Sequence, residues 1–112
     1  MNRRDLGLLG EDTAARLLSA KGYEIIERNF RCRYGEIDII AFRGNCLYFV
    51  EVKTRQGTGY GRPCESVTPL KREHMKKAAV FYLREKCRRE YRAPRLSFQV
   101  IEIVIEHIEN AF

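Results

Sequence analysis

The sequence predicts a single-domain α/β protein whose elements follow in the order helix, three strands, helix, strand. Three observations lead to this prediction. The chain has 112 residues, the length of one ordinary domain, so we treat residues 1–112 as a single domain. Two segments have apolar residues at helical spacing, and the remaining apolar runs have strand length and are bounded by glycine, asparagine or proline. Helices packed on a sheet, in two or three layers, are the natural outcome.

The first helix is predicted over Asp5 to Lys21. Residues of its expected buried stripe recur at helical spacing: Leu6, Leu9, Thr13, Leu17 and Ala20, with Leu18 beside them. Gly22 follows as a C-terminal stop signal. Glu11 borders the stripe, so its carboxylate needs a partner, which is either a buried arginine or a metal ion.

Three strands are predicted next, over residues 23–30, 35–42 and 46–54. The last two are separated by Gly44-Asn45, a dipeptide that favours a two-residue hairpin turn, so Arg43 should face Cys46. Residues 56–62 contain three alternating glycines and no core pattern, which predicts a loop.

A second helix is predicted from Thr68-Pro69 to about Arg89, because threonine is a good N-cap and proline suits the first turn. Pro94 then precedes a final strand over residues 96–108. The basic residues concentrate around this helix, since residues 68–95 hold ten Lys/Arg against three Glu. With a net charge of +6, the chain favours a polyanionic partner, although solvated helix faces and an acidic protein partner are the alternatives.

The cysteines and the apolar runs limit the compartment. The four cysteines lack metal-ligand spacing, so we expect reduced thiols in the cytoplasm: Cys32, Cys46, Cys64 and Cys87. The longest apolar stretches are far short of a bilayer span, so no membrane partner is expected.

Counting along the predicted hairpin places two carboxylates opposite each other. The facing pairs are Asp38 with Glu51, Glu36 with Lys53, and Ile40 with Phe49. The other face is apolar and collects Ile37, Ile39, Val50 and Val52. Opposed like charges destabilise a hairpin unless something offsets the repulsion, and Mg²⁺ bound by carboxylate oxygens would do so.

Lys53 points into the same site, where an ammonium group can orient water or neutralise developing charge during phosphodiester hydrolysis. The alternative is a solvated hairpin face on which Lys53 pairs with Glu36 or Glu51. Spacing alone favours neither.

Two stretches of the chain resemble the YraN family of bacterial proteins: Gly-Glu-Ile-Asp-Ile-Ile-Ala at 35–41 and Phe-Val-Glu-Val-Lys-Thr-Arg at 49–55. The resemblance extends to Gly10-Glu11, to Gly22-Tyr23 and to the ending at 108–112, so it covers nearly the whole chain. That family is similar to archaeal Holliday junction resolvases of the PD-(D/E)XK nuclease superfamily. The resemblance implies a mixed β-sheet flanked by helices, in the order αβββαβ, with a restriction-endonuclease-like core.

Carried over position by position, the resemblance also implies a site. The implied catalytic residues are Glu11, Asp38, Glu51 and Lys53, and the implied metal ligands are Asp38, Glu51 and the carbonyl of Val52. The superfamily's proline is absent before Asp38. Gln99 stands where an acidic residue is expected and leaves that role unfilled.

The leading hypothesis is a Mg²⁺- or Mn²⁺-dependent endonuclease acting on DNA in preference to RNA, with branched DNA in repair or recombination as a candidate substrate. The alternative is an adaptor that keeps the nuclease fold and binds nucleic acid with little or no cleavage. The likeness to resolvases implies a homodimer. The predicted nucleic-acid contacts are Arg33, Arg55, Arg62, Lys71, Arg72, Lys76 and Lys77, with Tyr34 and Tyr60 as candidates for stacking on unpaired bases.

Overall fold

The elements of the computed structural model follow the predicted order, and the structure describes residues 1–57, 67–86 and 92–112. Their bounds are α1 Arg3–Ala20, β1 Glu24–Cys32, β2 Gly35–Arg43, β3 Cys46–Gln56, α2 Pro69–Glu85 and β4 Arg95–Ile105. The strands form one sheet in the order β1-β2-β3-β4, antiparallel except for the parallel pair β3 and β4. The prediction of a mixed sheet flanked by helices in the order αβββαβ is therefore confirmed.

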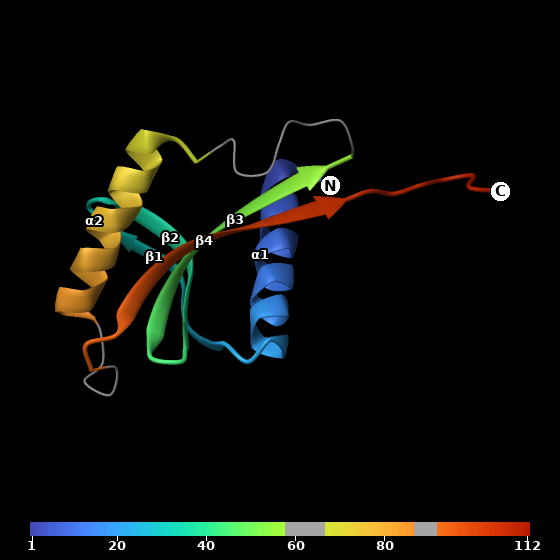
Figure 1. Ribbon diagram of the computed structural model, residues 1–112. Coiled ribbons are helices and arrows are strands. Elements are labelled where there is room, and N and C mark those ends of the chain that lie inside the picture. The colour runs from blue at the N-terminus through green and yellow to red at the C-terminus, as the bar shows by residue number, and fades with distance from the viewer. Residues whose placement is uncertain (58–66, 87–91) are drawn as a thin grey trace.

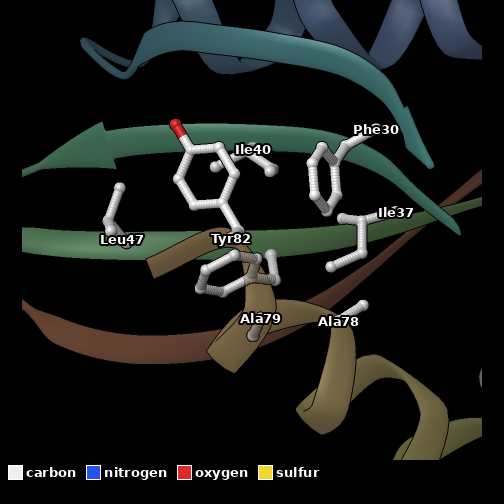
Figure 2. Packing of buried hydrophobic residues seen from close by; sticks show 8 residues of the cluster. Phe30, Ile37, Ile40, Leu47, Ala78, Ala79 and Tyr82 are labelled. Carbon is white, nitrogen blue, oxygen red and sulfur yellow. The ribbon is translucent and has the colours of Figure 1, made fainter. Parts of the chain in front are cut away.

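One helix covers each face of the sheet (Figure 1). The core on the α2 side consists of Phe30, Ile37, Ile40, Leu47, Phe49, Ala78, Ala79 and Tyr82 (Figure 2). The core on the α1 side consists of Ala14, Leu18, Ile39, Ala41 and Val50. Strands β2 and β3 supply both cores, which explains why their sequences are nearly continuous in apolar residues.

Ile37 packs in the α2-side core, so the prediction that it shares a face with Ile39 is wrong. The pairing of β2 with β3 ends at Ile39, and beyond that residue β2 is paired only with β1. There the backbone of β1 is irregular, because Asn29 has a φ of 55°. The strict alternation of a regular strand is lost at this point.

The buried face of α1 also differs from the predicted stripe. Its buried residues are Gly10, Ala14 and Leu18, whereas Leu9 and Leu17 are 41% and 40% exposed. The cause is a close approach to β3, since a Cβ on Gly10 would lie 1.8 Å from Thr54 Oγ1 and 2.8 Å from Thr54 Cβ. Gly10 and Ala14 therefore face the sheet together with Leu18, whereas Leu9 and Leu17 of the predicted stripe lie to the side.

The helix starts are set by caps. Asn2 accepts the N–H of Asp5 at 2.8 Å, so α1 begins two residues before the predicted Asp5, and its last residue is Ala20. Thr68 caps α2 and Pro69 is its first residue, as predicted. The helix ends at Glu85 within the described chain, and its predicted end near Arg89 lies outside the described residues, as do residues 58–62 of the predicted loop.

The last strand ends at Ile105 and not at the predicted Ile108, because Ile105 pairs with Gln56, the final residue of β3. Beyond that pair, the described residues provide no further strand partner for β4. Neither helix of the described chain is long and apolar enough to cross a membrane.

Candidate functional site

The hairpin of β2 and β3 has the predicted register from its turn as far as Ile39. Gly44 and Asn45 both have positive φ, 58° and 56°, as this kind of tight turn requires, and Arg43 pairs with Cys46. The ladder ends at Ile39 with Val50. The facing pairs predicted beyond it, Asp38 with Glu51 and Glu36 with Lys53, are therefore absent from the ladder.

Asp38 itself accounts for the early end of the ladder. Its Oδ2 accepts a hydrogen bond from the backbone N–H of Val52 at 2.7 Å. This N–H would otherwise donate to a backbone carbonyl of β2 and continue the ladder. This bond fixes the carboxylate of β2 against β3 and still brings it to the neighbourhood of Glu51. The predicted proximity of the two acids therefore arises from a side-chain contact and not from a facing pair.

The carboxyl of Asp38 resists ionisation. Burial is the main cause that raises its pKa, from 3.8 to about 6, and the charge of Glu51 raises it further. The bond from Val52 and the charge of Lys71 act in the opposite direction. The hydrogen bond and the nearby positive charge therefore do not fully offset the cost of ionising Asp38 in this site.

Glu51 is the only charged residue of the described chain that is classed as buried, at 8% exposure. It follows Val50 of the α1-side core on the central strand β3. Its Oε1 forms an ion pair with Nζ of Lys71, which reaches it from the first turn of α2. Sequence reasoning assigned Lys71 to nucleic acid and missed this pair, because nothing local in the sequence places the start of α2 beside β3.

Lys53 is exposed and forms no ion pair within the described chain. The two acids that could have paired with it on a solvated hairpin face have other partners: Glu36 contacts Arg31 at 3.1 Å, and Glu51 contacts Lys71. Lys53 lines a cavity of about 520 Å³ between the start of α1 and the end of β3, and Glu11 and Val52 line it too.

Glu11 is brought to this cavity by the close contact of α1 with β3 at Gly10. Burial is the largest cause that raises the pKa of Glu11, and the charge of Asp38 raises it further. The charge of Arg28 and a hydrogen bond with Asn29 lower it. Its Oε1 is buried and has no hydrogen-bond partner among the described residues. Arg28 donates instead to Asp12 at 2.7 Å, so this arginine does not satisfy the Glu11 oxygen.

Asp38, Glu51 and the carbonyl of Val52 form a donor set that suits a hard divalent cation. Among the described residues, no three His, Cys, Asp or Glu side chains lie close enough to hold a metal by themselves. Mg²⁺, however, is usually held by one or two carboxylates together with water and substrate oxygens. The unpartnered oxygen of Glu11 and the raised pKa of Asp38 both indicate negative charge that a cation would offset. The residues present therefore fit a Mg²⁺ or Mn²⁺ ion.

The predicted nucleic-acid contacts separate into two groups. Arg33, Lys76 and Lys77 line one cavity of about 530 Å³ between α2 and the turn from β1 to β2, together with Tyr34, Arg84 and the acids Glu73 and Glu85. The Arg33 guanidinium lies 4.9 Å from the centre of the Tyr34 ring and donates to its hydroxyl at 2.8 Å.

The remaining contacts lie elsewhere. Arg72 lines a separate cavity beside β4 with Phe98 and Gln99, and Arg55 forms a largely buried ion pair with Glu102. Lys71 is held by Glu51, while Arg62 and Tyr60 lie outside the described residues. Arg55 thus connects β3 to β4, a role that the sequence pattern did not indicate, and it also lines the cavity of Lys53 and Glu11.

Comparison with known proteins identifies a family. The model of "Uncharacterised protein family UPF0102" matches residues 10–103. The chain is 47% identical to a UPF0102 protein of Syntrophomonas wolfei, covering 97% of this chain and 98% of the relative. Identity is 49% to a relative from Rhodococcus opacus, with 96% and 95% covered, and 41% to one from Caldicellulosiruptor saccharolyticus over the full length of both chains.

Proposed function

The chain belongs to the UPF0102 family, and we propose that it is a metal-dependent endonuclease of the PD-(D/E)XK superfamily that hydrolyses phosphodiester bonds in DNA. The observation that supports this most is the Asp38 carboxylate, fixed by the Val52 N–H beside Glu51 at the end of a hairpin ladder. A buried carboxylate whose charge is not fully offset destabilises a fold, and a bound cation supplies the missing positive charge.

Asp38, Glu51 and the Val52 carbonyl are the proposed cation ligands. A bound Mg²⁺ or Mn²⁺ supplies Lewis-acid polarisation of the phosphoryl oxygen and lowers the pKa of a bound water. The bond from the Val52 N–H orients Asp38, so this ligand is positioned before substrate arrives. Glu11, whose buried Oε1 has no hydrogen-bond partner among the described residues, lines a cavity together with Val52 and Lys53 and is the proposed ligand of a second cation there.

Lys53 is the proposed water-positioning cation. Its ammonium is exposed, lies two residues from Glu51 on β3 and is not held in an ion pair within the described chain. It is therefore available to a phosphate or to the attacking water. Removing its charge should lower the rate of the chemical step more than the affinity for nucleic acid.

The cavity between α2 and the turn from β1 to β2 is the proposed path of the nucleic-acid backbone. The cavity there combines the ring of Tyr34 with four positive charges, on Arg33, Lys76, Lys77 and Arg84, against two acids, Glu73 and Glu85. Lys77 is six residues beyond Lys71, which corresponds to roughly 9 Å along a helix. A strand whose scissile phosphate lies near Glu51 would thus place a neighbouring nucleotide at this cavity.

A second candidate is a nucleic-acid-binding adaptor without cleavage activity. The ion pair between Lys71 and Glu51 favours it, because that pair neutralises one of the two proposed metal-ligating carboxylates. The two candidates share the nucleic-acid surface and differ only in whether the acids bind a metal.

Cleavage assays separate them. Purified protein is incubated with duplex, single-stranded and four-way-junction DNA and with RNA, in Mg²⁺, Mn²⁺ or EDTA, beside Asp38→Asn, Lys53→Met and the exposed control Asp12→Asn. The endonuclease proposal expects metal-dependent cleavage by the wild type and the control, and loss in the two site variants. Binding by all four proteins without cleavage that depends on Asp38 would establish the adaptor. Size-exclusion chromatography with light scattering tests the proposed homodimer on the same samples.

A further inference from the structure

The first turn of α2 carries a lysine that has no role in the proposed hydrolysis yet contacts one of its ligands. Nζ of Lys71 is paired with Oε1 of Glu51. The two partners differ in exposure, since the Glu51 side chain is 10% exposed and the Lys71 side chain 43%. The carboxylate is therefore fixed in the sheet, whereas the ammonium is free to exchange into solvent.

Building on the proposed function, we infer that the Lys71 ammonium occupies the cation position on Glu51 when no metal is bound, and must withdraw for a metal to bind. The start of α2 is then a gate on metal loading. A buried carboxylate without a counter-charge is strongly unfavourable, so Lys71 stabilises the metal-free protein. The same contact occupies Oε1, one of the two Glu51 oxygens that a cation could use.

The two cations exclude each other because of charge and distance. An ammonium and a divalent ion sharing one carboxylate oxygen would lie within a few ångströms in a poorly solvated site, where like charges repel strongly. The Glu51 side chain is only 10% exposed, so its carboxylate has little room to move and relieve this repulsion. Lys71 has the freedom to move, because its backbone lies in a capped first turn and only its long side chain reaches the acid.

Once displaced, the ammonium remains within a side-chain length of the metal and next to the basic face of α2. A phosphate bound at the metal is then the nearest anion that it can contact. Lys71 is thus a positioning residue that changes its partner from a protein carboxylate to a substrate phosphate. Lys53, which is exposed and not paired within the described chain, has no such exchange to make.

Mn²⁺ affinity tests this inference without reference to catalysis. Free Mn²⁺ is titrated by electron paramagnetic resonance in wild type, Lys71→Met, Lys71→Arg and the matched control Lys53→Met. Lys71→Met should bind Mn²⁺ at least about tenfold more tightly, because no ion pair has to be broken. Lys71→Arg keeps a competing charge and should stay near wild type, and Lys53→Met should change affinity by less than about threefold because its charge is screened by solvent. Unchanged or weaker binding in Lys71→Met overturns the inference.

A measurement on the wild type covers the case in which Lys71→Met fails to fold. Lysine ammonium resonances are followed by ¹⁵N NMR as Mg²⁺ is added, with Lys71 assigned from the Lys71→Arg spectrum. The gate predicts that the Lys71 resonance moves or is lost on Mg²⁺ addition, and a resonance unaltered at saturating Mg²⁺ contradicts it.

The outcomes also separate this inference from the proposed function. Tighter Mn²⁺ binding in Lys71→Met without DNA cleavage supports the gate and refutes the endonuclease. Metal-dependent cleavage by the wild type, with unchanged Mn²⁺ affinity in Lys71→Met, refutes the gate and supports the endonuclease. Absence of Mn²⁺ binding in every variant refutes both.

Discussion

Replacing Asp38 by asparagine should stabilise the metal-free protein at neutral pH. The asparagine side chain is isosteric and keeps an oxygen that can accept the N–H of Val52. What the substitution removes is the negative charge, whose burial and whose proximity to Glu51 raise the pKa of the carboxyl.

The magnitude follows from that pKa. A rise from 3.8 to about 6 means that the folded protein holds the Asp38 proton more tightly than the unfolded chain does. For an acid of this kind, stability is lost as pH rises from the unfolded pKa through the folded one. Roughly two pKa units correspond to ~3 kcal/mol, and solvent screening of this partly exposed carboxyl reduces the effect to about 1 kcal/mol. Above pH 6, Asp38→Asn should be more stable than wild type by that amount.

Urea unfolding in EDTA measures the difference at pH 8, 6 and 4.5. The advantage of Asp38→Asn should be largest at pH 8 and should shrink as the wild-type carboxyl takes up its proton at lower pH. Asp12→Asn, an exposed control, should stay within about 0.5 kcal/mol of wild type throughout. Added Mg²⁺ should also narrow the gap, because only the wild type gains binding free energy. An Asp38→Asn protein that is less stable than wild type at pH 8 without metal would show that the Asp38 charge does not destabilise the folded protein.

Two further predictions concern the positioning of α1 and the nucleic-acid surface. Gly10→Ala should lower the free energy of unfolding by about 2 kcal/mol, because its Cβ would overlap Thr54 Oγ1 and also lie 2.8 Å from Thr54 Cβ. Gly7→Ala, which has open space around its Cβ, should leave the stability unchanged or raise it. Urea unfolding measures both. Equal stabilities would show that α1 does not require the close contact. Lys77→Gln should weaken DNA binding and lower the slope of log affinity against log salt by about 1, while Arg16→Gln on the opposite helix should change neither quantity. Fluorescence anisotropy at several salt concentrations measures the affinity and the slope. Equal slopes in the two variants would show that the α2 surface does not bind DNA.

The fold could be predicted largely from local signals, and the exceptions have identifiable causes. Gly44-Asn45 predicts the turn and therefore the register, because only a tight turn with positive φ makes Arg43 face Cys46. The alternation cannot show that Asp38 would take the Val52 N–H and end the ladder. That event depends on a side-chain bond that competes with backbone pairing.

The buried face of α1 could not be predicted from its leucines for a related reason. Periodicity predicts a helix, but the side facing the sheet depends on how closely the helix approaches, and Gly10 permits an approach that a leucine stripe would prevent. The contact of Lys71 with Glu51 joins residues 20 positions apart on different elements. The sequence shows both residues, yet their pairing depends on how α2 packs against the sheet.

Equilibrium binding of Mn²⁺ shows whether Asp38 and Glu51 form a metal site. Titration of wild type, Asp38→Asn and Glu51→Gln, followed by electron paramagnetic resonance at pH 7.5, reports binding independently of any substrate. The proposed centre predicts a saturable site in the wild type that both substitutions abolish or greatly weaken. Binding that survives both substitutions, or a wild type that binds no Mn²⁺, would contradict the assignment of Asp38 and Glu51 as metal ligands.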